Sequence, residues 1–190
     1  MNNTNKATLA PEDRKTFFRL FLPLLDYTNQ AFEVSELLEE QFRRGSPSHQ
    51  ELKRVADVLW ENTEIIDEYI EAVRNQFGLE EADRHLLEGW RKPVTGNFVL
   101  ERHLSKGSVF IEAETEKVYL VKGLSDPWSE MLKNLAPPIL MRTTLIPFRD
   151  IIISDGLIAL ENIRFGAGYR ESFKEIYLTA KQSGKIITSL

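Results

Sequence analysis

The sequence predicts an α+β protein, in which an N-terminal helical segment over residues 1–92 precedes a twisted antiparallel sheet or small, partly open barrel over residues 93–190. Two changes in pattern support this prediction. Up to Trp90, apolar residues recur at steps of three and four, as they do along one face of a helix. After Pro93 they alternate with polar residues, a period typical of strands. Two accessory helices, near 127–135 and 169–183, are expected within the second region.

The first helix is expected to begin at Pro11, a residue that suits the first turn. Glu12 and Asp13 follow it and favour the positive end of the helix dipole. The apolar pattern continues through Pro23, which lacks a backbone donor and therefore predicts a kink. A more polar helix is expected over residues 34–43.

The next helix has the clearest signals in the chain. Ser48 and Glu51 have the spacing of a capping box, which predicts that the helix begins there. Apolar residues over 52–73 then form one stripe, which predicts a continuous helix that ends at Gly78. A shorter helix is expected over residues 80–91.

A three-stranded meander is expected after Pro93, with turns at Lys106-Gly107 and Thr115-Glu116. Further along, Asp155-Gly156 separates two apolar β-branched runs, a strong hairpin signal. It predicts a hairpin that joins residues 151–153 to 157–158. The remaining expected elements are a short helix capped by Asp126 with Pro127 at its first position, an extended stretch over 139–146, a last helix that stops at Gly184, and an edge strand at Ile186-Ile187.

Composition limits the class of protein. The chain has 190 residues, 42% of them hydrophobic, which is enough for an ordinary globular core. It has no cysteine, which excludes disulfides, thiolate metal sites and cysteine nucleophiles. No apolar run approaches the roughly 18 residues that a bilayer-spanning helix needs, and the polar start is unlike a signal peptide. A cytoplasmic protein without a membrane partner is expected.

Charge is unevenly distributed. Residues 1–95 hold 12 basic against 18 acidic residues, whereas residues 96–190 hold 12 against 11. Neither half has the concentrated positive field that a phosphate backbone requires, which argues against nucleic acid as a partner. An acidic helical surface also disfavours binding to anionic lipid. The expected partner is another protein, and a homo-oligomer remains open.

Four stretches carry a resemblance to known proteins. Leu-Trp-Glu-Asn-Thr-Glu-Ile-Ile-Asp lies at 59–67, Val-Lys-Gly-Leu at 121–124, Thr-Thr-Leu-Ile-Pro-Phe at 143–148 and Ser-Asp-Gly-Leu at 154–157. Through these stretches the chain resembles a group of bacterial proteins of unknown function. The resemblance covers nearly the whole chain and implies no activity, catalytic residue or cofactor.

The meander provides the first candidate site. The register that keeps the apolar residues of its first two strands together places Glu101 opposite Glu112. Two facing carboxylates raise one pKa and can share a proton or cation. The alternatives are a solvated face, or pairing with an arginine such as Arg102. The candidate polar cluster consists of Glu101, His103, Glu112 and Tyr119.

A second candidate lies before the last helix. Gly166 and Gly168 are flanked by Arg164 and Arg170, and successive backbone N–H groups at the start of a helix can hold an anion. The pattern is neither a Walker loop nor a complete dinucleotide fingerprint. An ordinary turn is the alternative interpretation.

Acidic spacing suggests a metal site that helix geometry disfavours. Glu36-x-x-Glu39 and Glu64-x-x-Asp67 match the magnesium-binding pattern of all-α nucleotide pyrophosphohydrolases. On a helix, however, Glu64 falls on an acidic stripe that faces away from the apolar one. The carboxylates are therefore interpreted as a solvated face, and no metal ligand is predicted.

The function expected from these observations is a non-enzymatic binding or regulatory module without a cofactor. The chain contains no Gly-x-Ser-x-Gly elbow, His-Glu-x-x-His pair or EF-hand loop. The alternative is a small metal-assisted hydrolase of a phosphorylated compound, assembled from scattered residues.

Overall fold

A computed structural model describes residues 7–190, apart from the side chains of Gln76 and Phe77. The chain divides into two compact units at Pro93/Val94. The helical unit comprises Glu12–Pro93; the sheet unit comprises Val94–Leu190 and the described residues before Glu12. The α+β class, with helices preceding a sheet, is confirmed. No helix in the described part of the chain has the length and apolar character required to cross a bilayer.

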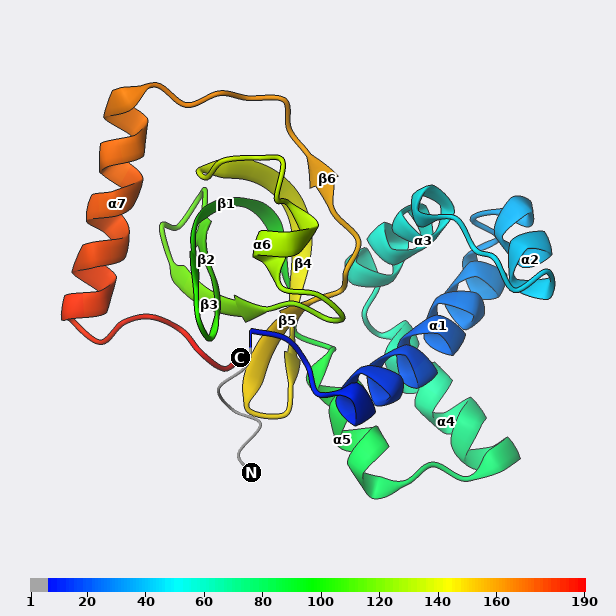
Figure 1. The fold of residues 1–190 in the computed structure, drawn as a ribbon. Coiled ribbons are helices and arrows are strands. Elements are labelled where there is room, and N and C mark those ends of the chain that lie inside the picture. Colours follow the sequence, from blue (N-terminus) through cyan, green and yellow to red (C-terminus); the bar gives the residue numbers. More distant parts are fainter. Residues whose placement is uncertain (1–6) are drawn as a thin grey trace. The chain divides into compact units, whose positions relative to one another are not determined.

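The helical unit is held together by aromatic packing. Its helices are α1 (Pro11–Phe32), α2 (Glu36–Arg43), α3 (His49–Glu61), α4 (Ile65–Phe77) and α5 (Glu81–Gly89), and they are drawn in blue to green in Figure 1. Phe21 of α1 stacks on Trp60 of α3, with 6.0 Å between the ring centroids. Trp90, just after α5, meets Phe17 and Phe21 edge-on at 5.7 and 6.0 Å. Edge-to-face aromatic pairs stabilise beyond the area that they bury, so these rings connect three parts of the unit.

The helix boundaries of this unit agree with the predicted ones only in part. Ser48 caps α3 and accepts a hydrogen bond from the Glu51 backbone N–H, as predicted. The Glu51 carboxylate bonds instead to the Ser35 hydroxyl at 2.5 Å and thereby ties α3 to the start of α2. The predicted continuous helix over 52–73 is wrong, because the chain breaks between α3 and α4. Asn62 stops α3 with its backbone at φ −132°, and its side-chain amide donates to the Val58 carbonyl, competing with the helical ladder.

The sheet unit contains a closed five-stranded barrel. Its strands are β1 (Val94–Leu104), β2 (Gly107–Glu112), β3 (Val118–Lys122), β4 (Ile139–Phe148) and β5 (Ile151–Ser154), and β6 (Ala159–Leu160) extends it beside β4. The strand order β1-β2-β3-β5-β4 closes because β1 also pairs with β4. All pairings are antiparallel except β3–β5, where Val121 lies beside Ile152. The sequence predicted a twisted antiparallel sheet or a small, partly open barrel. The structure has a closed barrel, in which one pair of strands is parallel.

One short helix lies across an end of the barrel. α6 (Trp128–Met131) is shorter than the predicted 127–135 helix, and Pro127 caps it with no side-chain hydrogen bond, so the expected Asp126 cap is wrong. Trp128 packs edge-on against Phe110 of β2 in the barrel core, with 5.1 Å between the centroids. The architecture resembles the OB fold, which is also a five-stranded Greek-key barrel. A shared architecture implies no function.

The predicted hairpin at Asp155-Gly156 is not present. The hairpin instead joins β4 to β5 through Arg149 and Asp150, and Arg149 adopts a positive φ of 56°. The residues after Gly156 return to β4 as β6 rather than to β5. Asp155 accepts the Leu157 backbone N–H at 3.0 Å, so it forms a side-chain-stabilised turn. Residues 157–158 cannot pair with β5, because β4 occupies one edge of that strand and β3 occupies the other.

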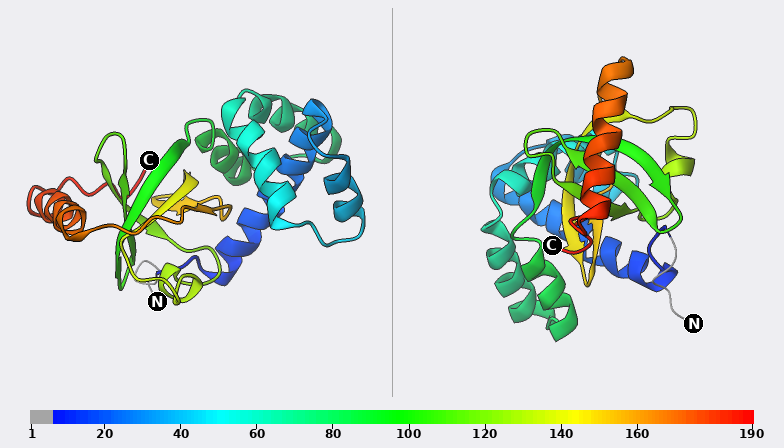
Figure 2. Two further views of the ribbon diagram at one scale, coloured as in Figure 1. Left: turned by 90° about the horizontal axis from the view of Figure 1, so that it is seen from above. Right: turned by 90° about the vertical axis from the view of Figure 1, so that its left-hand side faces the viewer.

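A helix covers the outer face of β1–β3. α7 (Ala167–Gln182) matches the predicted last helix, and both views in Figure 2 show it alongside these strands. The apolar cluster beneath it contains Val99, Val109, Ile111, Val118 and Tyr177. The predicted edge strand at Ile186-Ile187 reduces to a single bridge between Ile187 and Tyr119.

Gly123 provides a test of this packing. Its backbone bonds to Ala7 and Leu9 on one side, and a Cβ atom would lie 2.0 Å from the Asp126 carbonyl oxygen on the other. We expect Gly123→Ala to lower the free energy of unfolding by about 2 kcal/mol or more, because backbone must move to relieve the overlap. Gly96→Ala is the control, since its Cβ would meet nothing within 4 Å. Urea denaturation measures both, and equal midpoints would contradict the packing.

Candidate functional site

The residues of the predicted polar cluster do not meet as expected. Glu112 pairs with Phe98 rather than with Glu101, and a bulge interrupts the β1–β2 ladder between Leu100 and Arg102. The predicted register is therefore wrong. Alternation specifies register only where one face is polar, whereas β2 buries the side chains of both its faces, one in the barrel and one beneath α7.

Glu101 is neutralised by its neighbour. Its side chain is only 8% exposed, and it makes a two-pronged ion pair with Arg102, whose Nη2 lies 2.8 Å from Oε1. The hydrogen bond that Arg102 donates to Glu101 raises the pKa of Arg102. The guanidinium lies over the Tyr177 ring at 4.2 Å, a cation–π contact with α7. One alternative interpretation of this cluster was that a carboxylate pairs with an arginine. Glu101 follows that alternative, because it pairs with Arg102.

Glu112 and Tyr119 do come together. The Tyr119 hydroxyl donates to Glu112 Oε2 at 3.1 Å, and the Thr115 hydroxyl donates to the same oxygen. Burial, and then the nearby Glu112 charge, raise the pKa of Tyr119 to about 12. His103 lies apart from them, with Nδ1 2.8 Å from the Ser108 hydroxyl, and burial lowers its pKa. The cluster thus resolves into local pairs in which the buried phenol acts as a donor.

The residues before α7 form an ordinary helix start. Gly166 occupies the cap position, and Arg170 Nε donates to the Phe165 carbonyl at 3.0 Å. Arg164 is exposed, and Gly168 lies within the first turn. Arg170 therefore uses one of its guanidinium N–H groups to bind the chain's own backbone.

The acidic motif is not gathered into one place. Glu36 and Glu39 lie in the first turn of α2, whereas Glu64 caps α4. Asp67 pairs with Arg91 at 3.2 Å. Within residues 7–190, no group of three or more His, Asp or Glu side chains could hold a metal ion.

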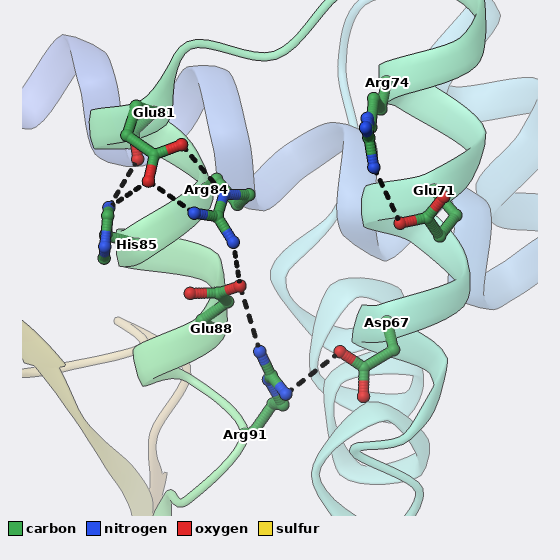
Figure 3. A network of polar contacts seen from close by, with 8 residues as sticks. All are labelled: Asp67, Glu71, Arg74, Glu81, Arg84, His85, Glu88 and Arg91. Atoms are coloured by element: carbon green, nitrogen blue, oxygen red, sulfur yellow. Dashed lines mark hydrogen bonds and ion pairs between the residues drawn. The ribbon is translucent and has the colours of Figure 1, made fainter.

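Charged side chains form a network between α4 and α5. Figure 3 shows it running from His85 through Glu81, Arg84, Glu88 and Arg91 to Asp67, with Arg74–Glu71 as a separate pair. Arg84 Nη1 lies 2.8 Å from Glu88 Oε1, and Arg91 Nη2 lies 3.3 Å from the same oxygen. The hydrogen bonds from Arg84 lower the pKa of Glu81. These guanidiniums already have carboxylate partners, so the network joins helices rather than presenting free cations.

A groove in the helical unit is the strongest candidate site. We call it the α1–α4 groove. It has a volume of about 700 Å³ and is lined by residues of α1, of α4, of the segment between α4 and α5, and of α5 itself. This volume falls within the range of ligand pockets, roughly 300–1,000 Å³. Its lining combines apolar, aromatic and charged side chains, among them Arg19, Pro23, Asp26, Tyr27, Tyr69, Val73, Glu80 and Asp83.

Two tyrosines form the aromatic part of the groove. The rings of Tyr27 and Tyr69 lie 5.4 Å apart between centroids and are tilted by 58°. Tyr69 is only 7% exposed, and burial raises its pKa, so the hydroxyl stays protonated at neutral pH. The two rings come from α1 and α4, which places two aromatic surfaces in one groove.

The charges of the groove are unbalanced. Arg19 binds the buried Asp83 with two hydrogen bonds of 2.8 Å, which raise the pKa of Arg19. Within this pair, the positive charge of Arg19 neutralises the negative charge of Asp83. Asp26 accepts a hydrogen bond from the neutral Gln30 amide, and Glu80 is exposed. Arg19 also interacts with the charge of Glu80. The lining therefore carries one cation, Arg19, and three carboxylates, those of Asp26, Glu80 and Asp83.

Sequence reasoning missed this groove. The two tyrosines stand 42 positions apart in helices whose packing no local pattern predicts. The available signal was weak and consisted of large aromatic residues with polar tips on otherwise apolar stripes.

No protein-family model, no curated protein and no solved structure matches the chain. The resemblance to a bacterial group of proteins, carried by residues 59–67, 121–124, 143–148 and 154–157, thus remains a prediction. The candidate site is argued from its geometry alone.

The Tyr119–Glu112 contact can be measured by titration. The folded protein favours the protonated phenol, because its pKa of about 12 lies above the ordinary 10.0. The stability that this contributes is present below pH 10 and is lost as the pH rises through the folded value. Absorbance of the phenolate, compared with Tyr119→Phe, should show this late titration. Glu112→Gln should lower the pKa of Tyr119 but leave it raised by burial, whereas Glu114→Gln, in the adjoining exposed turn, should not change it. Titration of Tyr119 together with exposed tyrosines would contradict the contact.

The Arg19–Asp83 pair predicts a stability change. The Asp83 side chain is 7% exposed and the Arg19 side chain 56%. When the ion pair is lost, the buried group at position 83 loses its charged partner, whereas the Arg19 guanidinium can be hydrated by water. We expect Asp83→Asn to lower the free energy of unfolding by about 1–2 kcal/mol. Glu12→Gln breaks an exposed pair with Lys15 and should cause no measurable change. Urea denaturation of the two variants checks the difference, and equal effects would contradict it.

Proposed function

We propose that the protein is a non-enzymatic binding module that captures a basic segment of a partner protein in the α1–α4 groove. The observation that carries the proposal is the presence of two tyrosine rings and of an excess of carboxylates over cations in one groove. No observation in the described residues favours the alternative of a metal-assisted hydrolase.

The charge of the helical region supports a basic partner. Residues 1–95 contain 18 acidic against 12 basic residues, so the field around this part of the chain attracts cations. Complementary charge increases the rate of encounter and suppresses acidic competitors. Within the groove, Asp26 and Glu80 extend that negative field to the place where a side chain would enter.

The aromatic residues support recognition of a lysine or arginine side chain. A cation within about 6 Å of a tyrosine ring is attracted to the ring face. The methylene stem of such a side chain also packs on apolar surface, which Pro23 and Val73 supply here. The groove therefore offers contacts to both the stem and the charged head.

A defined peptide tests the proposal. Fluorescence anisotropy of the full chain with a labelled peptide of arginine, lysine and leucine should show saturable binding that weakens with salt. A peptide with glutamate in place of its basic residues should not bind. Tyr27→Ala and Glu80→Gln should each weaken binding by about threefold to tenfold, the effect of losing one cation–π or charge contact.

The matched control lies in the same unit but outside the groove. Glu36→Gln combined with Glu39→Gln removes two charges from α2 and should leave the affinity within about twofold, because long-range attraction is screened by salt. If this control loses as much affinity as the groove variants, binding is non-specific attraction and the proposal fails. It also fails if the acidic peptide binds equally well.

A further inference from the structure

A cavity in the sheet unit lies apart from the α1–α4 groove. It has a volume of about 600 Å³ and is lined by residues 115–118, by Lys185 and Ile187, and by one face of α7 with its C-cap. This volume is within the range of pockets that bury small ligands. The α7 side consists of residues spaced three and four positions apart, as on a single helix face: Ser172, Glu175, Ile176, Thr179, Ala180 and Ser183. The cavity exists with α7 in its docked position, so filling it requires no element to leave.

The cavity has an apolar floor. Val118 is 2% exposed, and Ile176, Ala180 and Ile187 are partly buried with it. Hydroxyl groups also line the cavity, and the Thr179 hydroxyl makes no hydrogen bond to another part of the described chain. Apolar surface with a few polar groups that can orient a ligand is the usual composition of a binding pocket.

The charges of the lining balance one another. Residues 115–118 contribute one carboxylate and one ammonium group, those of Glu116 and Lys117, and the α7 side contributes another of each, those of Glu175 and Lys185. All four side chains are exposed, and among residues 7–190 none of them has an ion-pair partner. The cavity therefore presents both signs of charge on each of its two sides and has no net charge.

Glu116 has a backbone conformation that glutamate rarely adopts. Its φ is 57°, in the left-handed region that glycine adopts without a penalty. The turn between β2 and β3 would therefore be more stable with glycine at this position. Strained residues of this kind cluster at binding and active sites, and the Glu116 carboxylate lines the cavity. The structure thus holds a charged side chain at the cavity at a cost in stability.

We propose that this cavity binds a short peptide with apolar side chains and two free ends. The floor receives an apolar side chain, and the charged ends of the peptide meet carboxylate and ammonium groups on the two sides of the cavity. Because the lining has no net charge, it attracts neither a simple cation nor a simple anion, whereas a zwitterion satisfies both signs. A dipeptide separates its charges by roughly 7 Å and can reach both sides, whereas a free amino acid carries both charges on one carbon.

Calorimetric titration of the full chain with leucyl-leucine tests the proposal. We expect saturable binding. A blocked peptide, N-acetyl-leucyl-leucine amide, has neither charge and should bind at least about tenfold more weakly. Glycyl-glycine lacks the apolar side chains and free leucine lacks the separated charges, so both should also bind more weakly than leucyl-leucine. Absence of leucyl-leucine binding, or equal binding of the blocked peptide, overturns the proposal.

Glu116→Gly separates a binding role from a structural one. The substitution removes a carboxylate from the cavity and relieves the left-handed backbone. We therefore expect the affinity for leucyl-leucine to fall by about twofold to fivefold, while the urea midpoint rises. Glu33→Gly is the matched control, because Glu33 also has a positive φ, 50°, but follows α1 in the helical unit. It should raise the midpoint and leave the affinity unchanged. An unchanged affinity in Glu116→Gly overturns the assignment of this cavity.

A matched pair of double variants provides a second readout. Lys117→Gln combined with Glu175→Gln removes one charge of each sign from the cavity and should weaken leucyl-leucine binding at least about fivefold. Glu171→Gln combined with Lys174→Gln makes the same change at an ion pair of α7 that lies outside the cavity lining. This control should keep the affinity within about twofold, and an equal loss in both double variants overturns the proposal. None of these residues lines the α1–α4 groove, so the outcome is independent of the proposed function.

Discussion

The sheet unit depends on the double pairing of β1. Phe98, Val99 and Leu100 pair with β2 on one side and with β4 on the other, so this part of the strand has no free edge. Closure of the barrel then requires β1 to leave β4 after Leu100 while it continues along β2. The bulge at Glu101 occurs at this point, and bulges bend a strand and redirect its side chains. The barrel core and the outer apolar face both follow from this one strand.

Closure also decides where the charges of the sheet unit can find partners. The bulge places Glu101 and Arg102 next to Tyr177 of α7, whereas Glu112 meets Tyr119, a residue of the barrel core. Carboxylates expected to repel each other are instead satisfied locally, which is the usual state of buried polar groups. The α1–α4 groove of the helical unit differs, because its three carboxylates exceed its single cation, Arg19, which is hydrogen-bonded to Asp83. This contrast is why the binding site is proposed there.

The proposed binding of a basic segment depends on the charge and the aromatic surface of the α1–α4 groove, so it should respond to salt and to single side chains.

Local signals in the sequence were enough to determine the helix cap at Ser48, the change from helices to strands at Pro93 and the presence of α7. These features depend on residues a few positions apart, so propensity and periodicity report them directly. The break at Asn62, the β1–β2 register and the use of β5 by β3 were decided by the tertiary structure. A strand buried on both faces has no polar face to specify its register, and a groove between Tyr27 and Tyr69 exists only once distant helices pack. Long-range packing determined those features, and the candidate site is one of them.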